Sequence, residues 1–198
     1  MQSTNDQITQ IRWHGRGGQG AITAAKVVAM AAFSSGYGGV VMAPTFGTER
    51  RGAPVTTSLK ISRSKIYDLS PIKTPDIVVV LDHLILDEVD VTAGLKPGGL
   101  IILNSPHGLE SHSFPGYRTS VVNATKLGIE AGLRKGIINT GIIGAFGRAS
   151  GLIDIETLAN SIEKEFAGRK PEANAEAARL VYAATLMTNN ATGGSSND

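Results

Sequence analysis

The feature that most constrains the fold of this chain is a glycine-rich turn near its N-terminus. The segment IRWHGRGGQGAITAAKV, Ile11 to Val27, carries four glycines within the six residues from Gly15 to Gly20. An apolar run precedes them and an alanine-rich run follows, and the spacing of Gly15, Gly17 and Gly20 fits G-x-G-x-x-G. A strand, a glycine turn and a helix in this order let a phosphate approach the N–H groups of the helix start.

Short apolar runs typical of buried strands alternate with helical segments along the rest of the chain. The expected strands are 8–14, 40–43, 75–82, 100–104 and 117–123, with a hairpin made of 56–62 and 65–69. The expected helices are 21–33, 84–93, 124–134, 141–150, 155–166 and 173–187. The alternation predicts an α/β fold: a Rossmann-like, open and mostly parallel sheet flanked by helices, with a helical C-terminal part.

Several local signals sharpen this prediction. The run 40–43 is expected to be a central parallel strand, and Asp154 to cap the helix that follows it. Gly141, Gly144 and Gly147 are three apart in an apolar helix, which indicates a face packed closely against another helix. Ligand sites of such sheets lie beyond the carboxyl ends of the strands, so the expected site residues follow strands, at 15–20, 43–54, 82–83 and 104–107.

Length and composition limit the function classes. The 198 residues favour one domain over 1–189, followed by a flexible polar tail, 190–198. The net charge of +2 argues against nucleic acid. The polar N-terminus and the lack of an apolar run of roughly 18 residues argue against a membrane and for the cytoplasm. The absence of cysteine excludes thiolate catalysis and cysteine-ligated clusters on this chain, and the histidines show no metal-ligand spacing, so no metal site is expected.

The glycine turn lacks the signatures of the two commonest phosphate ligands. A nicotinamide or flavin dinucleotide calls for an acid about 20 residues later, and VVMAPTF, Val40 to Phe46, offers none before Glu49. A Walker-type site needs Lys-Ser or Lys-Thr after the loop, and GGQGAI has neither. The residues alone therefore leave a phosphate-bearing ligand without these signatures, or glycines that serve only tight strand–helix packing.

Polar side chains beside the turn have two interpretations each. Arg16 and Gln19 are either phosphate contacts or, respectively, an exposed arginine and a helix cap. Arg50 and Arg51, in TERRGAP, form an anion clamp, a partner-docking loop or a solvated turn, and docking is favoured slightly. His83, after Asp82, is more often a hydrogen-bonded structural residue than half of an acid–base pair.

Four segments in order resemble a known family: HGRGGQGAITAAKVVAMAA, FGTERRGAPV, PDIVVVLDHLIL and INTGIIGAFGRASGLI. Up to about Phe166, the chain is similar to the gamma subunit of the 2-oxoacid:acceptor oxidoreductases, most closely to the pyruvate type. The pairing of GRGGQG with the later ERRGAP loop is the specific part of this likeness. Thr48, where proline is common, and His83, where a small residue or proline often follows the aspartate, depart from the family pattern. They bear on docking and substrate subclass.

The resemblance implies a complex that oxidatively decarboxylates a 2-oxoacid, such as pyruvate or an aryl glyoxylate, to acyl-CoA, CO2 and two low-potential electrons. In that family, alpha and beta chains hold thiamine diphosphate and Mg, and iron–sulfur clusters on beta and delta chains pass electrons to ferredoxin or, through a flavin chain, to NAD. This chain would be a subunit with no catalytic residue and no independent activity. Its lack of cysteine and of Gly-Asp-Gly followed by Asn-Asn agrees with that role.

The resemblance also implies a site, because the gamma domain helps to close the coenzyme A site over the thiamine cofactor. The residues carried over as coenzyme A contacts are Gly15, Arg16, Gly17, Gly18, Gln19 and Gly20. Arg50 and Arg51 would touch coenzyme A or the alpha chain. Two alternatives stay open: a bridging subunit without ligand contacts and, less favoured, an autonomous NAD-dependent dehydrogenase.

Overall fold

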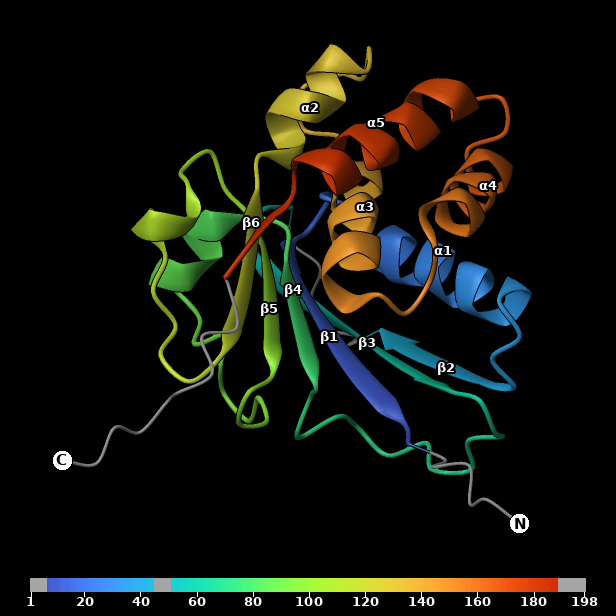
Figure 1. Ribbon diagram of the computed structural model, residues 1–198, viewed down its shortest axis with the longest axis vertical. Coiled ribbons are helices and arrows are strands. Elements are labelled where there is room, and N and C mark those ends of the chain that lie inside the picture. Colours follow the sequence, from blue (N-terminus) through green and yellow to red (C-terminus); the bar gives the residue numbers. More distant parts are fainter. Residues whose placement is uncertain (1–6, 45–50, 189–198) are drawn as a thin grey trace, which may run out of the picture.

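The computed structural model describes residues 7–44 and 51–188, which form one seven-stranded sheet and five α-helices (Figure 1). The predicted tail, 190–198, and Arg50 lie outside the described residues. The strands are β1 Thr9–Arg16, β2 Gly39–Pro44, β3 Pro54–Ser62, β4 Ile77–Val80, β5 Leu100–Asn104, β6 Arg118–Val122 and β7 Leu186–Met187. The helices are α1 Ala21–Ser34, α2 Ala124–Glu130, α3 Asn139–Ser150, α4 Ile155–Glu165 and α5 Pro171–Ala184.

The sheet has the strand order β2-β3-β1-β4-β5-β6-β7. Its centre, β1 to β6 through β4 and β5, is parallel, whereas β3 is antiparallel to β1 and to β2, and β7 is antiparallel to β6. Because two reversals restore the direction, β2 runs the same way as β1. The predicted open, mostly parallel α/β sheet is confirmed.

The prediction that 40–43 is a central parallel strand was wrong. These residues form β2 at the edge of the sheet, because β3 returns antiparallel and takes the place beside β1, pairing Ile11 with Leu59. Leu59 and Ile61 of β3 are fully buried, so β3 contributes the apolar face that the central position requires. An apolar run suits an edge strand as well when a helix covers one of its faces.

The predicted hairpin of 56–62 and 65–69 was also wrong. Residues 65–69 form no strand, because both edges of β3 are already paired. The segment is instead held by Lys60, whose buried Nζ donates to the Asp68 carboxylate at 2.8 Å and to the Asp68 carbonyl at 3.0 Å.

The predicted helix 84–93 is reduced to a 3₁₀ turn, η1, His83–Asp87. Beyond it, Asp90 accepts hydrogen bonds from the N–H and the hydroxyl of Thr92, local bonds that compete with helix formation. A second 3₁₀ turn, η2 Leu109–Ser111, follows β5. The β4–β5 and β5–β6 connections therefore carry 3₁₀ turns and loops in place of α-helices.

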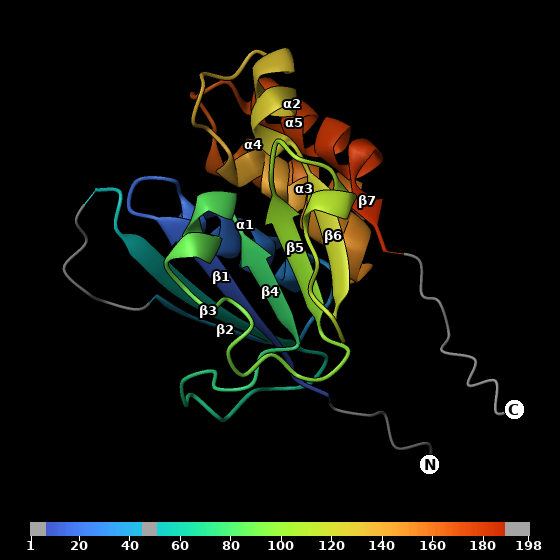
Figure 2. The same cartoon turned by 90° about the vertical axis from the view of Figure 1, so that its left-hand side faces the viewer.

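The helices and the 3₁₀ turns cover opposite faces of the sheet (Figures 1 and 2). Helices α1, α3, α4 and α5 pack on one face over the larger core, in which Trp13 and Phe146 meet at 5.7 Å between ring centroids. On the other face, η1, η2 and their loops cover a smaller cluster that includes Val78, Val80 and Ile101. The predicted flanking of the sheet is thus helical on one face only.

The C-terminal helices follow the sequence signals closely. Asp154 caps α4 by accepting from the Thr157 N–H at 2.8 Å, as predicted. The close helix packing predicted for the glycines of α3 is confirmed, because a Cβ on Gly144 would run into the Ala178 carbonyl of α5. Helix α5 ends at Ala184, three residues before the predicted end, and Leu186–Met187 pairs with β6 as β7.

Candidate functional site

The candidate site lies where the strand order changes direction. After β1 the chain passes through α1 to β2 on one side of the sheet, whereas β4, β5 and β6 follow one another on the other side. The carboxyl ends of β1 and β4 are therefore neighbours, with His14 paired to Val80. In open α/β sheets this position leaves a crevice for ligands. Here the glycine turn follows β1, and residues 81–83 follow β4.

The glycine turn is held by hydrogen bonds to the backbone of the two residues just before β3. Gly18 and Gly20 have φ of 92° and 80°, in the left-handed region that favours glycine. The Gly17 N–H donates to the Ala53 carbonyl at 2.9 Å, and the Gly52 N–H donates to the Gly17 carbonyl at 3.1 Å. Residues 52–53 therefore run alongside the turn and fix it.

Gln19 joins the turn to the end of β4. Its Oε1 accepts from the Arg16 N–H at 2.8 Å, and its Nε2 donates to Asp82 Oδ2 at 2.9 Å. The other carboxylate oxygen of Asp82 accepts from the Leu84 N–H at 3.0 Å. Helix α1 has no side-chain cap, and Gly20 stands at its N-cap, so Gln19 is not the helix cap that one interpretation of the sequence expected.

Arg16 is bound by two carboxylates. Its Nε donates to Asp82 at 3.1 Å, a second nitrogen to Glu88 at 2.6 Å, and the third to the Gly52 carbonyl at 3.1 Å. The hydrogen bond that Arg16 donates to Glu88 is the main cause that raises the pKa of Arg16. Burial opposes ionisation of Asp82, but its hydrogen bonds from Gln19, Leu84 and Arg16 together hold its pKa below the usual value. The Arg16 charge is therefore balanced within the site.

The start of α1 offers donors that the described residues do not use. The N–H groups of Gly18, Gly20, Ala21, Ile22 and Thr23 make no hydrogen bond to any described residue, and the first turn has no acidic side chain. Such N–H groups, together with the helix dipole, favour a bound anion. Of the two arginines carried over from the later loop, only one can be placed: Arg51 is exposed beside the turn, and a Cβ on Gly18 would lie 4.0 Å from its Cγ.

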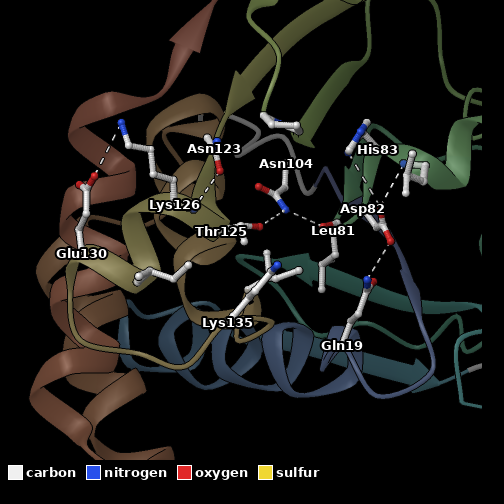
Figure 3. Close-up of a pocket in the computed structure, with 14 residues that line it drawn as sticks. Gln19, Leu81, Asp82, His83, Asn104, Asn123, Thr125, Lys126, Glu130 and Lys135 are labelled. Atoms are coloured by element: carbon white, nitrogen blue, oxygen red, sulfur yellow. Dashed lines mark hydrogen bonds and ion pairs between the residues drawn. The ribbon is translucent and has the colours of Figure 1, made fainter.

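A pocket of about 690 Å³ opens beside the glycine turn (Figure 3). Gln19 and Asp82 stand at one end, Lys126 and Glu130 at the other, and Lys135 lies between them in this view. The pocket lies beyond the carboxyl ends of β4, β5 and β6, and most of its wall is apolar. Its size and lining are those of a small-molecule site.

Asn104 forms the floor of this pocket. Its Nδ2 donates to the Leu81 carbonyl at 2.8 Å and to the Thr125 hydroxyl at 3.2 Å, and its Oδ1 accepts from the Ala124 N–H at 2.9 Å. The side chain is buried and ties β4, β5 and the start of α2 together. Its role is therefore to hold the pocket open in this shape.

Two lysines that line the pocket, Lys126 and Lys135, were not predicted from the sequence as site residues. Lys126 lies in the first turn of α2, which Asn123 caps by accepting from the Lys126 N–H at 2.9 Å. Lys135 lies in the loop between α2 and α3. The available signal was an asparagine cap directly after β6, which brings the first turn of α2 to the ligand edge.

The histidines do not form an acid–base pair or a metal site. His83 Nδ1 is 3.9 Å from the Asp82 carboxylate, too far for a hydrogen bond. Its ring lies 5.5 Å from that of His107, edge to face, and His112 hydrogen-bonds the Ser105 hydroxyl at 2.8 Å. In the ranges 7–44 and 51–188, no group of three or more His, Asp or Glu side chains could hold a metal ion. No helix of those ranges is long and apolar enough to cross a bilayer.

The fold and the site define an open α/β domain whose ligand edge combines a glycine turn at the switch point with a pocket over three parallel strands. The family model described as pyruvate ferredoxin/flavodoxin oxidoreductase matches residues 10–184. The chain belongs to this family, and its predicted resemblance to the gamma subunits is confirmed.

Three relatives show the extent of the similarity. The common gamma subunit of the pyruvate/ketoisovalerate oxidoreductases of Thermococcus kodakarensis is 44% identical over 91% of this chain and 98% of its own length. The pyruvate synthase subunit PorC of Methanothermobacter thermautotrophicus is 43% identical over 88% of this chain and 94% of its own. The crystal structure of the pyruvate oxidoreductase subunit PORC of Thermotoga maritima matches with a TM-score of 0.79 and 31% identity, covering 92% of this chain and 99% of that one.

Proposed function

We propose that this chain is the gamma subunit of a multi-subunit 2-oxoacid oxidoreductase and that its glycine turn binds a phosphate of coenzyme A. The complex would convert a 2-oxoacid and coenzyme A to acyl-CoA, CO2 and two electrons. Alpha, beta and delta chains would carry thiamine diphosphate, Mg and the iron–sulfur clusters, and ferredoxin or a flavin/NAD-linked chain would accept the electrons. This chain would supply a wall that closes over coenzyme A, and none of the groups that make or break bonds.

The observation that carries the proposal is the set of unused N–H groups where the glycine turn enters α1. They lie at the switch point of the sheet, next to a pocket of about 690 Å³. Because Arg16 is already bound to Asp82 and Glu88, the backbone provides the free anion donors here. The 0.3–1 kcal/mol that a helix start typically contributes at an exposed site grows when a partner chain excludes water.

The bridging alternative is supported by a different part of the same turn. The hydrogen bonds that fasten Gly17 to residues 52–53, and Gln19 to Asp82, give the glycines a packing role that needs no ligand. An experiment must therefore change the anion site while leaving these bonds intact.

Thr23 permits this separation. It is the third residue of α1, a position where glutamate favours a helix, and the side chain makes no hydrogen bond to any described residue. Thr23→Glu adds a negative charge beside the unused N–H groups, and Thr23→Gln adds similar bulk without charge. Both variants would be assembled with the partner chains, and the KM for coenzyme A would be measured in each complex.

We expect Thr23→Glu to raise the KM for coenzyme A roughly tenfold relative to Thr23→Gln, equivalent to about 1.4 kcal/mol. The KM for the 2-oxoacid and the yield of assembled complex should stay unchanged. Equal KM values for coenzyme A in the two variants would contradict the assigned site. Full assembly of both variants with equal, unaltered coenzyme A kinetics would favour the bridging role, because neither variant changes the bonds of Gly17 and Gln19.

A further inference from the structure

Strand β2 forms one outer edge of the sheet, below α1 in Figure 1. It pairs with β3 on one side only, so every second residue turns its backbone N–H and C=O groups away from β3. Residues 39–43 make no backbone hydrogen bond to any described residue outside β3. The outer side of β2 therefore presents a row of unused donors and acceptors.

The two edges of the sheet differ in their protection against pairing with another chain. The other edge strand, β7, has only two residues, and a short edge strand is itself a protection. Strand β2 has six residues, GVVMAP, without a charged side chain, and its pairing with β3 is regular from Gly39 to Pro44, without a bulge. Charges and bulges are the usual means of protecting an edge of this length. The edge suited to receive a further strand is therefore β2.

An apolar pocket opens beside this edge, on the helical face of the sheet. Its volume is about 400 Å³, and its walls come from α1, β2 and α4. Its apolar lining consists of Ala29, Met30 and Phe33 of α1 and Val40 of β2, and Phe33 is 74% exposed. Successive side chains of a strand alternate between the two faces of a sheet. A strand beside β2 would therefore direct every second side chain toward this pocket.

The charge of this pocket comes from one lysine. Lys164, in the last turn of α4, is exposed, and its ammonium group forms no ion pair or hydrogen bond with any described residue. The neighbouring Glu165 is already bound by Lys26 at 2.7 Å. An acidic side chain on a bound segment would pair with Lys164. A second copy of β2 would offer no such partner, because GVVMAP contains no acid.

We propose that an extended segment of a partner chain adds to the sheet beside β2. Its backbone bonds to the outer side of residues 39–43, an apolar side chain fills the pocket at Phe33, and an acidic side chain pairs with Lys164. In this mode of recognition the main-chain bonds supply affinity and the side-chain pockets supply specificity. The inference rests on one part of the proposed function, that this chain is a subunit of a complex, and it is independent of the coenzyme A site.

Amide hydrogen exchange of the full chain, measured alone and in the assembled complex, tests for the added strand. In the chain alone, the outward N–H groups within 39–43 should exchange rapidly, because they have no protein partner. We expect assembly to slow this exchange roughly tenfold or more, because the N–H groups then belong to an interior strand.

Two substitutions test the side-chain contacts, with the Kd of the labelled chain for the other chains of the complex as the readout. We expect Phe33→Gln to raise this Kd roughly tenfold, as the loss of an aromatic interface anchor does. Lys164→Gln should raise it about two- to fivefold, whereas Lys164→Arg should leave it nearly unchanged. Leu186→Gln is the matched control and should not change it, because Leu186 is an exposed apolar residue on the other edge strand.

Three results would overturn the inference. The first is equal exchange of 39–43 in the free and the assembled chain, and the second is the same Kd for Phe33→Gln and Leu186→Gln. The third is exchange of 39–43 that slows in the chain alone as its concentration rises, because the occupant would then be a second copy. A chain that assembles while β2 stays open contradicts this inference alone, whereas a chain that joins no complex contradicts the proposed function.

Discussion

The side-chain amide of Gln19 donates to Asp82 Oδ2 at 2.9 Å and so ties the turn after β1 to the end of β4, 63 residues away. The same carboxylate oxygen accepts from Arg16 Nε at 3.1 Å. Asp82 thereby orients both polar side chains of the glycine turn while it also lines the pocket. The shape of the ligand edge therefore depends on one carboxylate that the glycine motif does not contain.

The first prediction follows from this arrangement. Asp82→Asn replaces one acceptor oxygen by an NH2 group and leaves a donor of Arg16 or Gln19 without its partner. We expect a loss of about 1–3 kcal/mol in the free energy of unfolding, the usual penalty for an unsatisfied polar group. Urea unfolding followed by circular dichroism measures it. Asp87→Asn, at an exposed position of the same segment, is the control and should change the stability by less than about 0.5 kcal/mol.

The second prediction concerns pH and His14. Burial, with a smaller contribution from the Arg12 charge, lowers the pKa of His14 to about 4, and its Nε2 accepts from Arg12 Nε at 3.0 Å. The unfolded chain binds a proton at this histidine below about pH 6.5. The folded chain does so only below about 4, so stability is lost as the pH falls from 6.5 to 4, by up to about 3 kcal/mol.

Unfolding free energies measured between pH 7 and pH 4.5 test this prediction. His14→Gln should flatten the dependence above pH 4.5, because it removes the group that titrates. An unaltered chain whose stability is constant between pH 6.5 and 5 would show that His14 does not titrate in this way.

The third prediction concerns the packing of α3 on α5. A Cβ on Gly144 would meet the Ala178 carbonyl and lie 3.0 Å from the Tyr182 nitrogen, so Gly144→Ala must push two helix backbones apart. We expect a cost of about 3 kcal/mol or more, at the upper end of overpacking effects. Gly141→Ala, whose nearest atoms are side-chain carbons at 3.2 Å, should cost clearly less. Thermal unfolding gives both values, and equal melting temperatures would contradict the close approach.

The fourth prediction concerns backbone strain in the glycine turn. Gly18 has a φ of 92°, but a Cβ there would meet nothing closer than Arg51 Cγ at 4.0 Å. Substitutions at Gly18 therefore measure the cost of the left-handed backbone conformation, because the added side chain meets no steric clash. We expect Gly18→Asn to cost least, Gly18→Ala about 1 kcal/mol and Gly18→Val more, since asparagine tolerates the left-handed region best among them. An order that follows side-chain volume with no advantage for asparagine would contradict this interpretation.

The sequence was sufficient to predict elements that carry their own signals. The strand 100–104 was predicted correctly because four consecutive apolar residues and Asn104 lie between a glycine turn and a proline-containing loop. Helix α4 was placed within one residue because Asp154 caps it through a local bond. The glycine turn at the start of α1 was likewise predicted from the sequence, because the strand, the turn and the helix follow one another directly along the chain.

What escaped prediction depends on pairing between distant segments. Nothing in 40–43 distinguishes an edge strand from a central one, because that difference is decided by where β3 inserts. The bond between Gln19 and Asp82 joins residues 63 apart, and no local pattern marks it. The pocket also depends on distant segments: Lys126 and Lys135 line the same pocket as Gln19 only because β4, β5 and β6 align their carboxyl ends.

The uneven covering of the sheet has a consequence for how the domain opens. Four helices seal one face, whereas the other has only two short 3₁₀ turns and loops over a smaller apolar cluster. Segments with few buried contacts open without global unfolding, so amide hydrogens in 83–99 and 105–117 should exchange with solvent well before those of α1 or α3. Glu88, which binds Arg16, lies within the first of these segments. The segment expected to open most easily, 83–99, is therefore bonded to the glycine turn through Glu88 and Arg16. Its local opening would change the contacts of the turn while the core beneath the helices stays packed.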